Sequence, residues 1–231
     1  MDKIAQHLQR MAASESSSRS SAKDRIGAMS IDPSPVYTAD EALARLVAGN
    51  ERFVRGEARF PTVQKELLAA LAKGQHPYAT VLGCSDSRVP PELIFDAGFG
   101  ELFIIRVAGN VISPEVMGTL QFAAVHLRTP LFVVLGHEGC GAVGAALAAR
   151  TGAHEPVHIS LLLNDILPGL RGLPPELAPD EVMRTAVEAN VRWSMLQLLE
   201  TPEAKTRLRE GTMKLVGGVY ELESGGVRFL A

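Results

Sequence analysis

The 231-residue sequence has only two cysteines, one tryptophan and few aromatic residues, which make up 5% of the chain. Two cysteines cannot build the multiple disulfides that stabilise small secreted domains. No apolar run approaches the roughly 20 residues needed to span a bilayer. The first ten residues lack the continuous apolar segment of a signal peptide. We therefore expect a cytoplasmic protein that does not bind membranes.

The sequence also lacks a strong excess of either charge. Its formal net charge is −3, which gives no electrostatic reason to expect nucleic acid or an anionic membrane as a partner. Hydrophobic residues make up 46% of the chain and charged residues 21%, as in ordinary globular proteins. The length is compatible with one α/β domain and a sizeable core.

The N-terminal segment differs in composition from the rest of the chain. Residues 2–11 have the spacing of a short helix, and residues 12–23 are serine-rich and polar, as in linkers and disordered arms. We expect residues 1–35 to form a partly flexible helical and serine-rich arm. It is either a free tail or a segment that becomes ordered on a partner subunit. Residues 36–231 are expected to form the folded domain.

Apolar runs of strand length alternate with helical patterns through this second segment. Buried strands are expected at residues 78–82, 102–107 and 131–135, with helices between them. Strand–helix alternation predicts an α/β fold with a mainly parallel central sheet flanked by helices. Residues 213–222 and 227–230 flank a Ser-Gly-Gly turn, which predicts an antiparallel hairpin at the edge of the sheet.

Several helix boundaries can be predicted from local signals. Residues 38–41, Thr-Ala-Asp-Glu, match a capping box, and residues 113–115, Ser-Pro-Glu, match an N-cap followed by proline. Asp180 is expected to cap a long helix that ends near residue 200. A further helix is expected over residues 62–73, ended by glycine. Its inward face would consist of Val63, Leu67, Leu68 and Leu71.

Both cysteines follow predicted buried strands, and a histidine lies near the second. Cys84 follows the strand at 78–82, while His137 and Cys140 follow the strand at 131–135. Ligand sites of open α/β sheets gather at the carboxyl ends of strands. Two thiols and an imidazole form a donor set that zinc prefers, and three protein ligands leave a fourth position for water, as in catalytic sites. We therefore expect one zinc ion per chain.

An aspartate and an arginine follow Cys84 closely. Asp86 is near enough in sequence to ligate the metal itself, and Arg88 can clamp that carboxylate through two hydrogen bonds. If Arg88 holds Asp86, the metal keeps its water and Asp86 accepts a hydrogen bond from it. If Asp86 moves onto the metal, the site is closed and inert. The pair is therefore a candidate switch.

Other interpretations stay open on the residues alone. A closed structural site would use Asp86 as a fourth ligand. Cys84 and Cys140 could instead form a disulfide, or one of them could be a nucleophile beside His137. Residues 136–144 are glycine-rich and could bind phosphate at a helix N-terminus, but they lack the Lys-Ser/Thr of a P-loop.

The two metal motifs resemble those of the β-class carbonic anhydrases. They are Cys-Ser-Asp-Ser-Arg-Val at 84–89 and His-Glu-Gly-Cys-Gly at 137–141. The resemblance extends over roughly residues 38–231. It includes Gly74-Gln75, Gly100-Glu101-Leu102-Phe103, Arg106-Val107-Ala108-Gly109-Asn110 and Gly217-Gly218-Val219-Tyr220.

The resemblance implies an activity and the residues that perform it. Zinc would be held by Cys84, His137 and Cys140, with Asp86 and Arg88 as the catalytic pair. The reaction would be the reversible hydration of carbon dioxide to bicarbonate and a proton through zinc-bound hydroxide, as in a zinc lyase of the carbonic anhydrase type. Asp86 would ligate zinc only in a closed state.

The resemblance also implies a substrate pocket and an assembly. Gln75 would hydrogen-bond the substrate, and Phe103 and Ala108 would line the carbon dioxide pocket. The small side chain at position 108 would enlarge that pocket. The family builds its active site at a dimer interface, so a homodimer or a tetramer of dimers is expected, with N-terminal helices embracing the partner.

One departure from the family pattern concerns regulation. A branch of the family has tryptophan three residues before the first cysteine, as part of a regulatory bicarbonate pocket, and here that residue is Val81. We therefore do not expect that pocket, although Arg106 occupies the position of its arginine. Two other functions stay open: a non-catalytic zinc-stabilised binding module, and an enzyme for another linear heterocumulene such as carbon disulfide.

Overall fold

The computed structural model describes residues 37–59, 65–174 and 176–230, so the predicted arm at 1–35 lies outside the described residues. Helices and strands follow one another in the order expected of an α/β fold. They are α2 (Ala39–Val54), α3 (Lys65–Leu71), β1 (Ala79–Gly83), α4 (Pro91–Ile94), β2 (Leu102–Arg106), η1 (Ala108–Asn110), α5 (Pro114–Phe122), η2 (Ala123–Leu127), β3 (Leu131–His137), α6 (Gly141–Ala149), α7 (Val157–Ile166), η3 (Leu167–Gly172), α8 (Pro179–Leu199), α9 (Pro202–Arg209), β4 (Lys214–Tyr220) and β5 (Val227–Leu230).

The sheet has five strands in the order β2-β1-β3-β4-β5. The pairings from β2 to β4 are parallel, and only the β4–β5 hairpin is antiparallel. The predicted fold class is therefore confirmed, including the hairpin at the edge. Every residue of β1 and β3 is buried, because strands inside a parallel sheet are covered on both faces.

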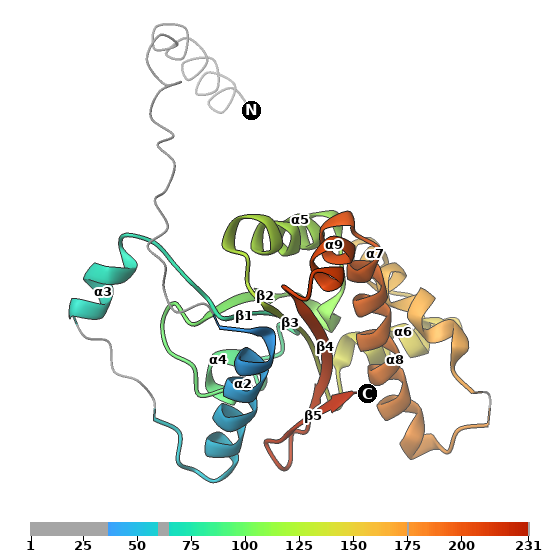
Figure 1. Cartoon of the computed structure of the whole chain (residues 1–231). Coiled ribbons are helices and arrows are strands. Elements are labelled where there is room, and N and C mark those ends of the chain that lie inside the picture. The colour runs from blue at the N-terminus through green and yellow to red at the C-terminus, as the bar shows by residue number, and fades with distance from the viewer. Residues whose placement is uncertain (1–36, 60–64, 175, 231) are drawn as a thin grey trace, which may run out of the picture. The chain divides into compact units, whose positions relative to one another are not determined.

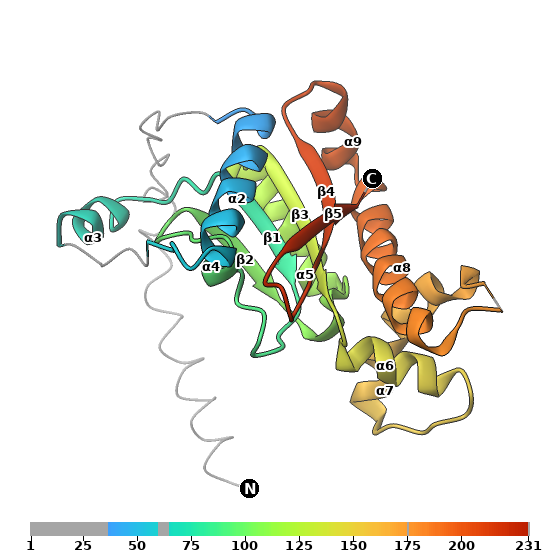
Figure 2. The same cartoon turned by 90° about the horizontal axis from the view of Figure 1, so that it is seen from below.

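Helices cover both faces of the sheet (Figures 1 and 2). The helices α2 and α4 lie together on one face, where Leu46 of α2 joins the larger core cluster. The helices α5, α8 and α9 lie on the other face, where Leu120 and Leu198 pack against Leu82 and Phe132 of the sheet. The helices α6 and α7 follow the carboxyl end of β3. Among the described helices, none is long and apolar enough to cross a membrane.

The capping box at the start of α2 is confirmed. The Thr38 hydroxyl accepts a hydrogen bond from the Glu41 backbone N–H at 3.2 Å, and the Glu41 carboxylate accepts one from the Thr38 N–H at 2.8 Å. These two bonds satisfy donors that a helix start otherwise leaves unpaired.

The prediction of an inward apolar face on α3 is wrong for the described part of that helix. The helix begins at Lys65 and has no fully buried residue; Leu67 and Leu68 are exposed, and Leu71 is half-buried. Val63 lies outside the described residues. In both views α3 stands apart from the sheet (Figures 1 and 2). Helical periodicity reveals an apolar face, but it does not reveal whether the same chain supplies a surface to cover it.

The predicted start of α8 is also wrong. Ala178 is the N-cap and Pro179 the first helical residue, so Asp180 lies inside the first turn. Proline is well suited to this first position, because its missing N–H would have had no partner there. The helix α9 was not predicted, although Thr201 caps it by accepting a hydrogen bond from the Ala204 N–H at 3.3 Å.

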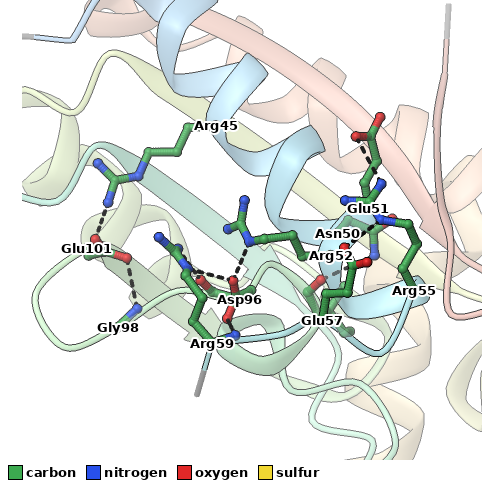
Figure 3. Close-up of polar contacts among 11 residues, drawn as sticks. Arg45, Asn50, Glu51, Arg52, Arg55, Glu57, Arg59, Asp96, Gly98 and Glu101 are labelled. Carbon is green, nitrogen blue, oxygen red and sulfur yellow. Dashed lines mark hydrogen bonds and ion pairs between the residues drawn. The ribbon is translucent and has the colours of Figure 1, made fainter. Parts of the chain in front are cut away.

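An ionic cluster joins α2 to the turns between α4 and β2 (Figure 3). The carboxylate of Asp96 is only 1% exposed and accepts hydrogen bonds from Nε of Arg52 at 2.6 Å and Nε of Arg59 at 2.9 Å. Burial opposes ionisation of Asp96, but these two arginines outweigh it and lower its pKa below the usual range. A second ion pair, between Arg45 and Glu101, lies beside this cluster.

A buried asparagine of α2 connects this helix to α4 and to the C-terminal β4–β5 hairpin. The side-chain amide of Asn50 donates to the carbonyl oxygens of Ile94, at 3.2 Å, and Gly225, at 2.8 Å. Its side-chain oxygen accepts a hydrogen bond from the Val227 N–H at 2.9 Å. One side chain thus holds α2, the end of α4 and the hairpin in a fixed arrangement.

Candidate metal centre

The two cysteines and His137 meet at the carboxyl end of the sheet. Cys84 directly follows β1, His137 is the last residue of β3, and Cys140 is the N-cap of α6. The strands β1 and β3 are parallel and pair in register, so their carboxyl ends bring these side chains together. One ligand atom from each residue lies within 4.8 Å of the others, and all three residues are buried. Both cysteines are free thiols, so the disulfide interpretation is not adopted.

The imidazole of His137 is oriented for coordination. Its Nδ1 lies 2.9 Å from the Glu138 carbonyl oxygen, which can only accept a hydrogen bond, so Nδ1 carries the proton. The other ring nitrogen, Nε2, is buried and has no hydrogen-bond partner among the described residues. A buried nitrogen with a free lone pair, facing two sulfurs, is the arrangement that a soft divalent metal requires.

The surroundings of the two sulfur atoms favour a thiolate at Cys84. The Cys140 thiol, the neighbouring His137 ring and the backbone N–H groups of Gly109 and Asp86 together outweigh the effect of burial and lower the pKa of Cys84 far below that of a free thiol. The hydrogen bond to Cys84 and the burial of Cys140 raise the pKa of the Cys140 thiol. Cys84 is thus the more readily ionised of the two thiols, and metal ligation requires deprotonated sulfur. The residues present fit zinc.

Asp86 lies beside this donor set and is clamped by Arg88. The Asp86 carboxylate accepts hydrogen bonds from Nε of Arg88 at 2.9 Å and from Nη2 at 2.7 Å, and also from the Arg88 backbone N–H at 2.9 Å. The hydrogen bonds from Arg88 hold the pKa of Asp86 well below its usual range, so the carboxylate is ionised at neutral pH. Oδ2 of Asp86 is 3.9 Å from Nε2 of His137. Of the two arrangements considered for Asp86, the structure has the one held by Arg88.

A second arginine fixes the backbone that carries Cys84 and Asp86. Nε of Arg106 donates to the Cys84 carbonyl oxygen at 2.9 Å, and its Nη2 donates to the Asp86 carbonyl oxygen at 2.6 Å. The side chain of Arg106 is thus occupied with the loop after β1.

Of the three residues expected to bind substrate, only Ala108 lies near the metal centre. Ala108 begins η1, next to Gly109, whose N–H donates to the Cys84 sulfur at 3.3 Å. Gln75 is exposed and precedes β1, so it lies toward the opposite end of that strand from Cys84. Phe103 pairs with the second residue of β1 and stacks on Phe122. One chain does not bring Gln75 and Phe103 to the metal centre, and their contact with substrate stays a prediction.

Sequence reasoning missed three polar residues that support the centre. Glu138 fixes the loop after β3 because its N–H donates to the Tyr220 carbonyl and its carboxylate accepts from the Leu222 N–H, both at 3.0 Å. Asn190 and Ser194 of α8 contact η1. The signal for these two was available: they interrupt the buried apolar stripe of a long helix at a spacing of one turn.

Comparisons with known proteins agree with this geometry. The sequence model of the carbonic anhydrase family matches residues 79–227. Carbonic anhydrase 2 of Mycobacterium tuberculosis is 39% identical over 183 residues, which cover 78% of this chain and 87% of that protein.

Solved structures of similar fold carry the same description. The β-carbonic anhydrase CcaA superposes with a TM-score of 0.68 at 28% identity, over 82% of this chain and 95% of its own. The β-carbonic anhydrase CafA of Aspergillus fumigatus gives 0.64 at 29% identity, over 81% of this chain and 90% of its own. Sequence match, fold and the Cys-His-Cys grouping lead to one conclusion: the chain belongs to the β-class carbonic anhydrase family, and it is an enzyme of that type.

Proposed function

We propose that this protein catalyses the reversible hydration of carbon dioxide to bicarbonate and a proton, with one zinc ion held by Cys84, His137 and Cys140. The observation that carries the proposal is the buried set of three donor atoms within 4.8 Å of one another, beside an ionised carboxylate. When bound, zinc would supply a Lewis acid that lowers the pKa of a coordinated water to near neutrality.

Asp86 and Arg88 form the pair that controls the open side of the centre. Arg88 occupies both carboxylate oxygens of Asp86, which keeps Asp86 from acting as a ligand. Oδ2 of Asp86 still faces the centre, 3.9 Å from Nε2 of His137. We assign to this oxygen the hydrogen bond from the nucleophilic water, because an ionised carboxylate accepts such a bond without taking the proton.

The same pair provides a closed state. The side chain of Arg88 is 53% exposed, so solvent partly screens its ion pair with Asp86 and the pair costs little free energy to break. A released Asp86 would become the fourth ligand and exclude water. The nearness of Asp86 to the donor set supports this switch.

The substrate pocket is built from two subunits. Ala108 lines the pocket from η1, and Gln75 and Phe103 act from a second subunit, so the working form is a homodimer or a tetramer of dimers. We place the protein in the cytoplasm, where the two free thiols of the centre stay reduced.

A variant that keeps zinc but loses the acceptor tests the proposal. Asp86→Ala removes a side chain that is not a ligand in the open state, so the variant should retain one zinc per chain and lose most of its stopped-flow carbon dioxide hydration. Asp40→Ala, the same change at an aspartate of α2 whose side chain is 82% exposed, is the matched control and should keep the parental rate. A parental rate for Asp86→Ala with full zinc occupancy would remove Asp86 from the mechanism.

A further inference from the structure

Two polar side chains lie on the buried face of α8. Asn190 is 1% exposed and Ser194 is 0% exposed. Their buried neighbours on this helix are apolar: Ala186, Val187, Val191 and Leu198. Burying polar groups is unfavourable unless they form hydrogen bonds, so the partners of Asn190 and Ser194 are informative.

Both side chains contact the same short element, η1. Nδ2 of Asn190 donates to the Gly109 carbonyl oxygen at 2.8 Å, and Oγ of Ser194 donates to the Asn110 carbonyl oxygen at 3.0 Å. Residues four apart on a helix face the same way, so the two bonds hold two consecutive carbonyl groups. The side chain of Asn110 also reaches Oγ of Ser194, at 3.5 Å.

The backbone that they hold is conformationally demanding. Gly109 and Asn110 both have positive φ, 68° and 44°, in the left-handed region that is sparsely populated. A Cβ atom at Gly109 would lie 2.8 Å from Cδ1 of Ile166 and 3.0 Å from Cβ of Ala142. Glycine adopts this conformation freely, but at Asn110 it is unusual and is favoured by contacts that fix the turn.

The turn is fixed next to a proposed zinc ligand. The Gly109 N–H donates to the Cys84 sulfur at 3.3 Å. The other backbone donor to this sulfur, the Asp86 N–H at 3.4 Å, belongs to the loop that carries Cys84 itself. Of these two backbone hydrogen bonds to the Cys84 sulfur, only the one from Gly109 comes from a different segment of the chain.

An unpaired atom argues against a role in packing alone. Oδ1 of Asn190 is buried and has no hydrogen-bond partner in the part of the chain that the structure describes. Leaving an oxygen unsatisfied in the core is costly, and an apolar side chain of the same size would avoid the cost. What asparagine adds at this position is the donor to Gly109.

We propose that Asn190 and Ser194 are positioning residues of the metal centre, which hold η1 so that the Gly109 N–H is directed at the Cys84 sulfur. The inference rests on the proposed role of Cys84 as a zinc ligand. Hydrogen bonds to ligand atoms orient the ligand and tune the metal, and losing one typically lowers metal affinity or activity about 10- to 100-fold.

The test uses the full chain loaded with Co²⁺ in place of zinc, because thiolate-to-cobalt charge-transfer bands report on the sulfur directly. Asn190→Leu keeps the branching of the side chain at Cγ and removes the donor. It should bind Co²⁺ and zinc about 10-fold or more weakly in competition with a chelator, with shifted charge-transfer bands. Ser194→Ala should change both readouts in the same direction by a smaller amount.

Leu198→Ala is the matched control, since Leu198 is buried on the same helix but packs in the cluster with α5 and α9. It should lower the thermal midpoint while leaving metal affinity and the charge-transfer bands unchanged. If Asn190→Leu has the metal affinity and charge-transfer bands of the parent, the inference is wrong. If Asn190→Leu does not fold, parental affinity and bands in Ser194→Ala would overturn the inference. A parent protein that binds neither metal would instead refute the proposed centre itself.

Discussion

The guanidinium of Arg88 holds both carboxylate oxygens of Asp86, two residues away, through hydrogen bonds of 2.9 and 2.7 Å. This two-point contact fixes the plane of the carboxylate as well as its position. Asp86 is thereby kept next to the donor set of Cys84, His137 and Cys140 without joining it.

Replacing Arg88 should release the carboxylate. In Arg88→Ala, Asp86 is free to occupy the fourth position, so hydration should fall about 100-fold, the cost expected when a reacting group is misplaced by roughly 1 Å. Zinc content should stay at one per chain. Arg88→Lys keeps the charge but not the two-point geometry, so it should recover only part of the rate. Stopped-flow assays on zinc-quantified protein measure both, and a parental rate in Arg88→Ala would contradict the clamp.

Removing one sulfur should remove the metal. Cys140→Ser replaces a thiolate ligand by a hydroxyl, and the purified variant should contain less than about one-tenth of a zinc per chain by elemental analysis, because a lost ligand weakens a three-ligand site strongly. Thr151→Ser, an exposed change after α6, is the control and should keep full occupancy. Full zinc in Cys140→Ser would mean that the ion binds elsewhere.

The buried, ionised carboxylate of Asp96 should stabilise the fold at neutral pH and lose this effect at low pH. Its pKa is lowered in the folded protein, so its contribution is complete above the ordinary carboxyl pKa of about 4 and disappears as the pH falls through the lower folded value. Asp96→Asn tolerates the positive φ of 45° and removes the charge. The variant should lose about 1–3 kcal/mol of unfolding free energy at pH 7, and the difference from the parent should shrink below pH 4.

Denaturant unfolding at pH 7 and pH 3 measures this difference, and comparing two proteins with the same metal centre cancels the effect of acid on that centre. The ion pair of Glu57 with Arg55 is exposed, so Glu57→Gln should have the same unfolding free energy as the parent at pH 7 and at pH 3. A difference between Asp96→Asn and the parent that does not change with pH would rule out the ionised pair as its cause.

Position 136 of β3, directly before His137, should not tolerate a residue larger than glycine. A Cβ atom at Gly136 would lie 2.6 Å from Cγ2 of Val191 and 3.2 Å from Cγ1 of Val187. Gly136→Ala should therefore push α8 from β3, destabilising the fold by about 1–3 kcal/mol and weakening zinc binding. Gly118→Ala, inside α5 where a Cβ meets nothing within 4 Å, should leave zinc binding unchanged and stabilise the fold by about 0.5–1 kcal/mol. Equal behaviour of the two variants would show that α8 does not pack as tightly as described.

The sheet and the donor set were predictable because both follow from local patterns. Apolar runs define β1 and β3, and residues that follow two parallel strands must meet at one edge. Cys84 and His137 are therefore brought together by topology, without knowledge of any side-chain contact. Five residues of the proposed site followed from this reasoning and from the motif.

Other features depend on surfaces that one sequence does not reveal. The leucines of α3 have helical spacing, yet Leu67 and Leu68 are exposed and only Leu71 is half-buried. The helix α9 was overlooked although Thr201-Pro202-Glu203 repeats the signal of Ser113-Pro114-Glu115 at α5. The roles of Asn190 and Ser194 are not visible in the sequence, because their partners lie about 80 residues away on η1 and only the tertiary fold joins them.

Zinc-dependent hydration is the central claim, and a titration tests it most directly. Metal-free protein is loaded with increasing zinc, and carbon dioxide hydration is followed by stopped flow at each step. The rate should rise in proportion to bound zinc and level off at one ion per chain. Hydration that stays at the buffer rate when one zinc per chain is bound would contradict the account.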